Sequence, residues 1–172
     1  MINKLLSTFS IIFFLFLVSC KENKIIKVDQ VTSSEIDIEN EKKAILETLN
    51  NETKAAFQRN YKDWKNKWVH DPDISKTYID FVDNTFSESI GWNEINQFVK
   101  TFIEEHPEPE PIPKLLDKID VRLYGKGAWV TYEQQDSIRG LKRETRLMEK
   151  VNGEWKIAGM QTTIYGFKTD EK

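Results

Sequence analysis

Four of the chain's five prolines stand at alternate positions from Pro107 to Pro113, and this segment separates two halves with different hydrophobic periods. Proline lacks a backbone N–H donor and holds φ near a single value, so the segment can be neither a helix nor a central strand. We therefore predict an extended connector there. Helices are expected before it and strands after it.

The half before the connector has the apolar spacing of amphipathic helices. Ile45 and Leu49 recur on one face of a long helix that is predicted to begin at Glu41. Two further helices are predicted, one capped by Asn60 and one capped by Ser89. Residues 74–82, which lie between these two helices, are compatible with either a short helix or a strand.

After the connector, apolar residues alternate with polar ones, and β-branched and aromatic types are enriched. Strands are expected over residues 116–124, 128–135, 141–151 and 155–165. Gly125 to Gly127 joins the first pair, and Asn152-Gly153, the dipeptide that most favours a two-residue type I′ turn, joins the last pair. The predicted fold class is α+β, with three N-terminal helices packed on one face of a twisted antiparallel sheet.

The first twenty residues have the organisation of an export signal. Lys4 supplies the positive charge, and the apolar run 9–18 is shorter than the roughly 20 residues that a membrane-spanning helix needs. The run ends in Leu17-Val18-Ser19-Cys20, which resembles the bacterial lipobox. Cys20 is the chain's one cysteine, which excludes a disulfide framework and favours lipidation at this residue.

These features predict a division of the chain into four parts: a lipoprotein signal peptide (1–19), a lipidated cysteine with a flexible tether (20–38), one folded domain (39–167) and a polar tail (168–172). The expected location is the cell envelope, with the lipid on Cys20 holding the protein at the outer membrane. The formal charge is −3 and no run of Lys or Arg occurs, so nucleic acid is not an expected partner.

Several short patterns in the predicted domain resemble those of a known superfamily. They are W-V-H-D-P at 68–72, S-x-x-x-G-W at 87–92, A-W-V-T-Y at 128–132 and R-E-T-R-L-M-E-K-x-x-G-E-W-K-I at 143–157. In this order they resemble the nuclear transport factor 2-like superfamily, and most of all its polyketide-cyclase-like branch. The resemblance implies a cone-like fold in which helices cover the concave face of a curved antiparallel sheet and enclose a pocket. It does not select an activity, because the superfamily includes isomerases, dehydratases, cyclases and non-catalytic domains.

The resemblance also indicates where pocket residues are expected, namely on the ends of the helices and on the inner face of the strands. The candidate ligand-binding residues are Trp68, His70, Trp92, Phe98, Tyr132, Arg146 and Met160. Strand parity is open, because either Trp129 or the pair Val130 and Tyr132 can face inward. We favour Val130 and Tyr132.

Two of these candidates carry charge or titrate. His70 is the candidate catalytic acid–base residue, although Asp71-Pro72-Asp73 after it has ordinary turn composition. Arg146 would suit a carboxylate if it pointed into the pocket. The alternative is that Arg143, Glu144 and Arg146 form cross-strand ion pairs at the surface of the sheet. No ligand set for a metal and no cofactor motif are recognised.

Three functions are compatible with the sequence. The preferred one is a lipid-anchored protein whose pocket binds a small, partly apolar molecule, or that serves as an accessory module. The second is a cofactor-independent isomerase, dehydratase or cyclase that uses a pocket residue such as His70. The third is a homodimerisation module, which exposed apolar residues on the outer face of the sheet, such as Trp129 or Leu147, would support.

Overall fold

The computed structural model describes residues 26–167, so the predicted signal peptide (1–19), Cys20 and the predicted tail (168–172) lie outside the described residues. In chain order, the described elements are α1 (Ile26–Phe57), α2 (Tyr61–Lys65), β1 (Ser75–Asp80), β2 (Thr85–Ile90), α3 (Gly91–Glu105), β3 (Asp120–Tyr124), β4 (Gly127–Asp136), β5 (Gly140–Val151) and β6 (Glu154–Gly166). None of these helices is long and apolar enough to cross a membrane.

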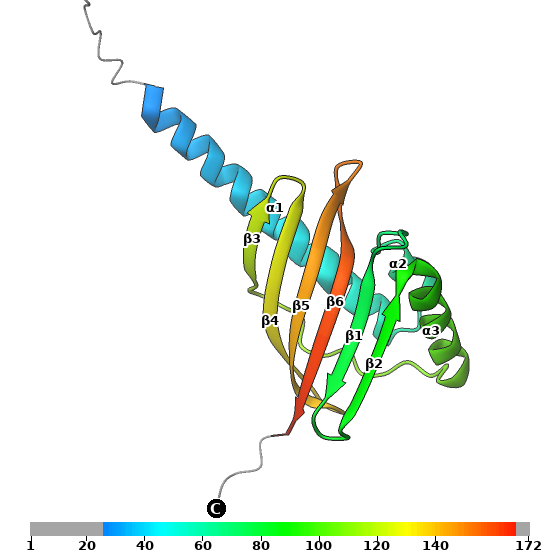
Figure 1. Ribbon diagram of the computed structural model, residues 1–172. Helices are drawn as coiled ribbons and strands as arrows, with labels where there is room; N and C mark the ends of the chain where they lie inside the picture. Colours follow the sequence, from blue (N-terminus) through cyan, green and yellow to red (C-terminus); the bar gives the residue numbers. More distant parts are fainter. Residues whose placement is uncertain (1–25, 168–172) are drawn as a thin grey trace, which may run out of the picture.

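The strands form one six-stranded curved sheet with the order β2-β1-β6-β5-β4-β3 (Figure 1). The α+β class is confirmed, but two details differ from the prediction. The sheet is mixed rather than antiparallel, because β1 pairs with β6 in parallel. The helices are also not consecutive, because β1 and β2 form a hairpin between α2 and α3. β2 escaped prediction because it is an edge strand with few apolar residues, and its inward positions include Ser87 and Ser89.

Helix α1 begins at Ile26, well before the predicted start at Glu41. The segment 20–38, which the sequence predicts to be a flexible tether, is therefore helical from Ile26 onward. The physical reason is that residues 26–57 contain no proline or glycine, so local backbone hydrogen bonds continue without a break. The N-terminal part of α1 projects beyond the sheet, and the C-terminal part crosses behind it (Figure 1).

The predicted cap of the second helix is confirmed. The Asn60 side chain accepts a hydrogen bond from the backbone N–H of Asp63 at 3.1 Å. The helix is shorter than expected, because Trp68 has left it to form an isolated bridge with Ile157 of β6. This bridge joins the end of the α2 segment to the sheet.

The start of α3 differs from the prediction. Ser89 belongs to β2, and the helix begins at Gly91 with Ile90 in the cap position. The Glu94 carboxylate satisfies the backbone N–H of Ile90 at 2.8 Å. Gly91 has a φ of +77°, and a Cβ there would approach the Pro72 carbonyl oxygen to 3.0 Å, so a larger residue would be strained at this turn.

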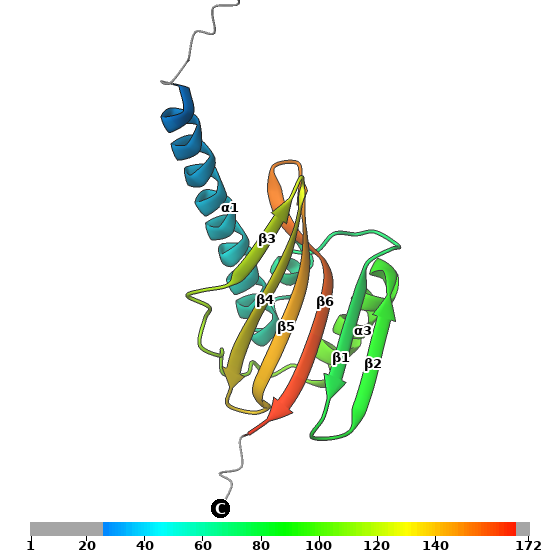
Figure 2. The same cartoon turned by 60° about the vertical axis from the view of Figure 1, so that its left-hand side comes forward.

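The proline-rich connector is extended, as predicted, and runs back along α1. The backbone N–H of Glu110 donates to the Phe57 carbonyl at 2.9 Å, and the Asn50 side-chain amide exchanges hydrogen bonds with the backbone of Leu116, at 2.9 Å in each direction. From the end of α3, the connector therefore passes the C-terminal end of α1 and then runs along α1 toward β3. The two views agree that α1 and α3 lie on the same side of the sheet (Figure 2).

The burial of alternate residues shows which face of β4 points toward the helices. Val130 and Tyr132 of β4 are buried on the face that α1 covers, and Trp129 is exposed on the opposite face, as the preferred alternative predicted. At the last hairpin, Asn152 and Gly153 have φ values of +52° and +86° between the paired residues Val151 and Glu154. The predicted two-residue turn with two left-handed residues is thus confirmed.

Candidate functional site

The strand β5 places three charged side chains on the covered face of the sheet. Lys142, Glu144 and Arg146 occupy alternate positions, so all three point toward the helices and all three are buried. Glu144 lies opposite Tyr132 on one neighbouring strand and opposite Thr162 on the other. Buried charges are costly unless they are paired, so the surroundings of these three residues decide what this face can do.

The three side chains line a cavity of about 310 Å³ between the sheet and the helices α1 and α3. Its apolar wall comes from both helices and from β6, and includes Phe57, Phe98, Val99, Phe102, Met160 and Ile164. Its polar part comes from the centre of the sheet and from Glu52 of α1. The cavity thus combines an apolar wall with a charged floor, as small-molecule sites commonly do.

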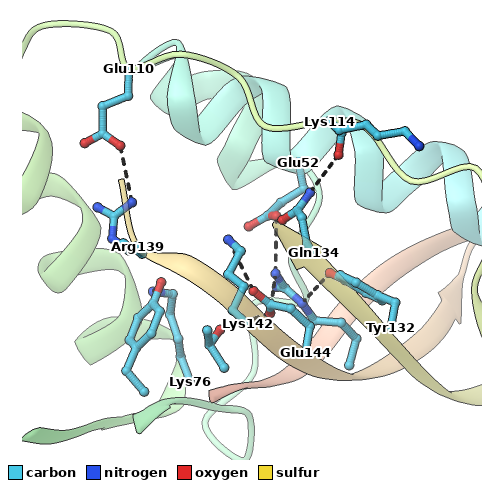
Figure 3. Close-up of polar contacts among 12 residues, drawn as sticks. Glu52, Lys76, Glu110, Lys114, Tyr132, Gln134, Arg139, Lys142 and Glu144 are labelled. Carbon is cyan, nitrogen blue, oxygen red and sulfur yellow. Dashed lines mark hydrogen bonds and ion pairs between the residues drawn. The ribbon is translucent and has the colours of Figure 1, made fainter. Parts of the chain in front are cut away.

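Two buried carboxylates hold the network together. Glu144 contacts Arg146 Nη2 at 3.1 Å and Lys142 Nζ at 3.6 Å, and it accepts a hydrogen bond from the Thr162 hydroxyl at 2.9 Å. Figure 3 shows Lys142 and Glu144 side by side, with Glu52 approaching from α1.

Glu52 is the second of these carboxylates, and it connects the sheet to both packed tryptophans. It accepts hydrogen bonds from the indole N–H groups of Trp64 at 2.9 Å and Trp68 at 3.3 Å. Its other oxygen lies 3.8 Å from Arg146 Nη2. These contacts fix the position of α1 over the charged strand.

Arg146 has donor capacity that the protein does not use. Its Nε donates to the Tyr132 hydroxyl at 3.2 Å, and its Nη2 faces both carboxylates. The remaining nitrogen, Nη1, is buried and has no hydrogen-bond partner in the part of the chain that the structure describes, on a residue that is 4% exposed. Burial works against the charge of Arg146, but Tyr132, Glu144 and Glu52 favour it and raise its pKa, so the guanidinium stays protonated.

Lys76 of β1 brings a further amine to the cavity. Its Nζ donates to the Tyr78 hydroxyl at 2.7 Å and lies 4.1 Å and 4.6 Å from the ring centroids of Tyr78 and Phe98. Among the residues whose side chains the structure describes, no carboxylate oxygen comes within ion-pair distance of this amine. Burial lowers the pKa of Lys76 to about 7, and Glu52 opposes the shift only in part.

The lowered pKa of Lys76 should make the stability of the protein depend on pH. Because Lys76 binds its proton less tightly in the folded protein than in the unfolded chain, the free energy of unfolding should rise with pH between about 7 and about 10 and be depressed below that window. Lys76→Met should remove this rise and stabilise the protein below pH 7. Urea denaturation across this pH range measures the effect, with Lys62→Met, at an exposed lysine, as the control. An unchanged pH profile in Lys76→Met would contradict the prediction.

The cavity is bordered by a second ion-pair group that fastens the connector to α1. Arg59 Nη2 contacts Glu110 at 2.6 Å. Arg139 Nη1 contacts the same carboxylate group at 3.4 Å (Figure 3). Burial raises the pKa of Glu110, but the hydrogen bond from Arg59 and the charge of Arg139 outweigh it, so the net direction is downward. Arg59 Nε also donates to the His106 carbonyl at 2.7 Å.

The structure brings together some of the residues that the sequence singled out and separates others. Phe98, Arg146 and Met160 line the cavity. Tyr132 and Trp68 lie directly behind it, where they hydrogen-bond to Arg146 and Glu52.

His70 and Trp92 do not line the cavity. The His70 ring is exposed, stacks on Trp92 with 3.9 Å between ring centroids, and has its Nε2 3.1 Å from the Lys65 carbonyl oxygen. In the described part of the chain, no group of three His, Cys, Asp or Glu side chains is placed to hold a metal ion.

Sequence reasoning missed the partners of Arg146. Glu144 was expected at the surface with Arg143, but only Arg143 is exposed, because strand parity sends alternate residues to opposite faces. Glu52 was also missed, although it follows Ile45 and Leu49 at helical spacing and so falls on the apolar face of α1. An acidic residue on an apolar helix face, together with an alternating K-x-E-x-R strand, is the signal that indicates a buried ion network.

Comparison with solved structures identifies the fold. An NTF2-like protein with a cystatin-like fold from Novosphingobium aromaticivorans aligns with a TM-score of 0.58 at 11% identity, covering 82% of this chain and 92% of that one. An NTF2-like superfamily protein from Salmonella enterica serovar Typhimurium aligns with a TM-score of 0.55 at 18% identity, over 76% and 93% of the two chains. The chain has the nuclear transport factor 2-like fold.

A third solved structure, a cystatin-like fold protein from Burkholderia xenovorans LB400, agrees with a TM-score of 0.55 at 17% identity, over 72% of this chain and 91% of that one. No family model and no curated protein sequence matches this chain. At these identities the nuclear transport factor 2-like likeness concerns the fold, so function has to be argued from the cavity itself.

Proposed function

We propose that this protein is a lipid-anchored binding protein of the bacterial envelope whose cavity holds a small, partly apolar carboxylate. One observation carries the proposal: Arg146 lines the cavity, and among the described residues its buried Nη1 has no hydrogen-bond partner. An unsatisfied buried donor on a charged group is costly, and a carboxylate oxygen is the acceptor that a guanidinium binds best.

The charge of the cavity floor supports an anion. Among the described residues, three cationic side chains and two carboxylates are buried there, namely Lys76, Lys142 and Arg146 against Glu52 and Glu144. This leaves one positive charge in the cavity whenever Lys76 is protonated. A bound carboxylate would neutralise this excess. The aromatic and aliphatic wall formed by α3 and β6 would hold the apolar part of the ligand.

Native mass spectrometry of the protein purified from its own host is the first test, followed by denaturation to release and identify any bound acid. In calorimetry, 4-methylbenzoate should bind about 10- to 100-fold more tightly than 4-methylbenzamide, because only the acid forms charge-assisted hydrogen bonds. The two probes match in size and shape. Equal affinity for the acid and the amide would remove the basis of the proposal.

The membrane anchor is a separate part of the proposal and rests on the sequence around Cys20. Cys20→Ser should move the protein from the membrane fraction to the soluble extract, because lipid attachment needs the thiol. Fractionation after growth with labelled palmitate measures both location and lipidation. Retention of the variant in the outer membrane would contradict the anchor.

Homodimerisation is a second candidate function, and one feature of the surface supports it. Trp129 and Leu147 are paired across β4 and β5 on the outer face of the sheet and are 48% and 39% exposed. If this face joins two copies, Trp129→Glu should convert a dimer into a monomer in light scattering. Phe81→Glu, at an exposed aromatic residue of the β1–β2 hairpin, is the control that should not. A monomeric wild-type protein would exclude this assembly.

The catalytic alternative, an isomerase, dehydratase or cyclase, stays a prediction, as does membership of the polyketide-cyclase-like branch. His70 as its acid–base residue lies outside the cavity. Pocket catalysis would therefore require another group that faces the ligand, and Lys76 is the titratable side chain there with a pKa of about 7.

A further inference from the structure

Lys76 and Arg146 are placed to contact the same ligand. Lys76 lies opposite Met160 in the β1–β6 register, and Met160 lies opposite Arg146 in the β5–β6 register. The two basic residues are therefore two strands apart on one row of the covered face, with backbones about 10 Å apart at the usual strand spacing. Both side chains reach into the one cavity, so a ligand a few ångströms long that rests on Met160 would lie between them.

The surroundings of the Lys76 amine differ from those of Lys142. Lys142 contacts the Glu144 carboxylate at 3.6 Å, whereas Lys76 donates to a neutral phenol, Tyr78, at 2.7 Å and lies against the Phe98 ring. In Figure 3, Lys76 stands to one side of the group formed by Lys142 and Glu144. Lys76 is 5% exposed, and its amine has no carboxylate partner among the described residues, so burying it there costs more than burying an apolar side chain.

This environment suits covalent chemistry. Burial lowers the pKa of Lys76 to about 7, so a large part of the amine is neutral and nucleophilic at neutral pH. Burial also raises the pKa of Tyr78, so its hydroxyl keeps its proton beside the amine. The amine and a proton-carrying hydroxyl are thus in direct contact within an apolar-walled cavity.

We propose that Lys76 forms a reversible imine with a small oxo acid, an aldehyde or ketone whose carboxylate is bound by Arg146. This inference rests on the proposed function of the same cavity and defines its ligand class. The neutral amine adds to the carbonyl carbon and forms a C–N bond, and the carbonyl oxygen becomes a hydroxyl. That hydroxyl leaves as water, with the Tyr78 hydroxyl positioned to supply the proton and to recover one from the nitrogen. No electron is gained or lost, so no oxidant or reductant is needed.

The test uses 4-carboxybenzaldehyde as the oxo acid and sodium cyanoborohydride to convert any imine into a stable secondary amine. Intact mass should show one addition per chain, and peptide mapping should place it on Lys76. Labelling of Lys76 should exceed that of any surface lysine by at least about ten-fold, because a pKa near 7 rather than about 10.4 greatly enlarges the neutral fraction. Benzaldehyde, which lacks the carboxylate, should label it more slowly.

The variants separate the covalent step from simple binding. Lys76→Arg keeps a positive charge at this position but should lose the adduct, because the guanidinium that replaces the amine stays protonated and does not act as the nucleophile. Binding of 4-methylbenzoate is measured on the wild-type protein, so that it is tested separately from the covalent step. Lys142→Arg, at the ion-paired lysine of the same cavity, should keep the adduct.

If 4-methylbenzoate binds but labelling is spread over surface lysines or survives in Lys76→Arg, the imine is overturned and the binding function stands. If neither 4-methylbenzoate binding nor selective labelling occurs, the proposed function fails and the imine fails with it.

Discussion

Arg146→Gln should lower the free energy of unfolding by about 3–5 kcal/mol, because it leaves two buried carboxylates without their shared cation. Glu52 and Glu144 both face Arg146 Nη2, at 3.8 Å and 3.1 Å, and neither has room to turn toward solvent. Urea denaturation at neutral pH measures the loss. The matched control is Arg143→Gln on the exposed face of the same strand, which should change stability by no more than about 0.5 kcal/mol.

The role of Arg146 in ligand binding has to be tested with a variant that stays folded. Arg146→Lys keeps a positive charge between the carboxylates but lacks the planar group that carries Nη1. It should bind 4-methylbenzoate about 10-fold or more weakly than wild type, while His70→Ala should bind it unchanged because His70 lies outside the cavity. Loss of binding in His70→Ala together with full binding in Arg146→Lys would reverse our assignment of the site.

Glu144→Gln should produce opposite effects on stability and on binding. Removing this carboxylate deprives Arg146 and Lys142 of their common partner, so the free energy of unfolding should fall by about 3 kcal/mol or more. The folded variant, however, carries one more positive charge in the cavity than the wild type. It should therefore bind 4-methylbenzoate more tightly, whereas a variant that is merely loosened would bind it less tightly.

Glu133→Gln is the control for this experiment, because Glu133 is exposed on the outer face of the neighbouring strand β4. It removes the same charge from the molecule as a whole without touching the cavity. Calorimetry with the acid and amide probes on both variants separates a local charge effect from net charge. Tighter binding in both variants, or in neither, would contradict the assignment of Glu144 as the internal counter-ion.

The predictable parts of the fold depend on local rules. Asn60 caps α2, Asn152-Gly153 makes the last hairpin, and the proline segment is extended, because each is determined by the conformational preferences of a few neighbouring residues. The same local logic failed at Ser89, which has the composition of a helix cap but pairs opposite Lys76 in an edge strand. Pairing with a neighbouring strand is a tertiary interaction, and it outweighed the capping preference.

The residues of the cavity also divide into those that local sequence predicts and those that tertiary packing decides. From the sequence alone, Arg146 was one of two alternatives, a surface ion pair or an inward cation, because a strand pattern with polar residues on both faces leaves parity open. Packing of α1 on β5 decided it, by covering Lys142, Glu144 and Arg146 and bringing Glu52 to them. Lys76 entered the site only because β1 pairs in parallel with β6, and no local feature near Lys76 indicates that long-range pairing.

The sequence by itself therefore determined the fold class, the last hairpin turn, the cap of α2 and the connector, because these depend on periodicity and on residue types within a few positions. Only the tertiary structure decided which charges are buried, that Arg146 Nη1 has no hydrogen-bond partner among the described residues, and that His70 lies outside the cavity. Burial and pairing of charge depend on segments that are far apart in the chain. Glu52, Lys76, Glu144 and Arg146 line one cavity only once α1, β1 and β5 have packed together, with β6 between the two strands.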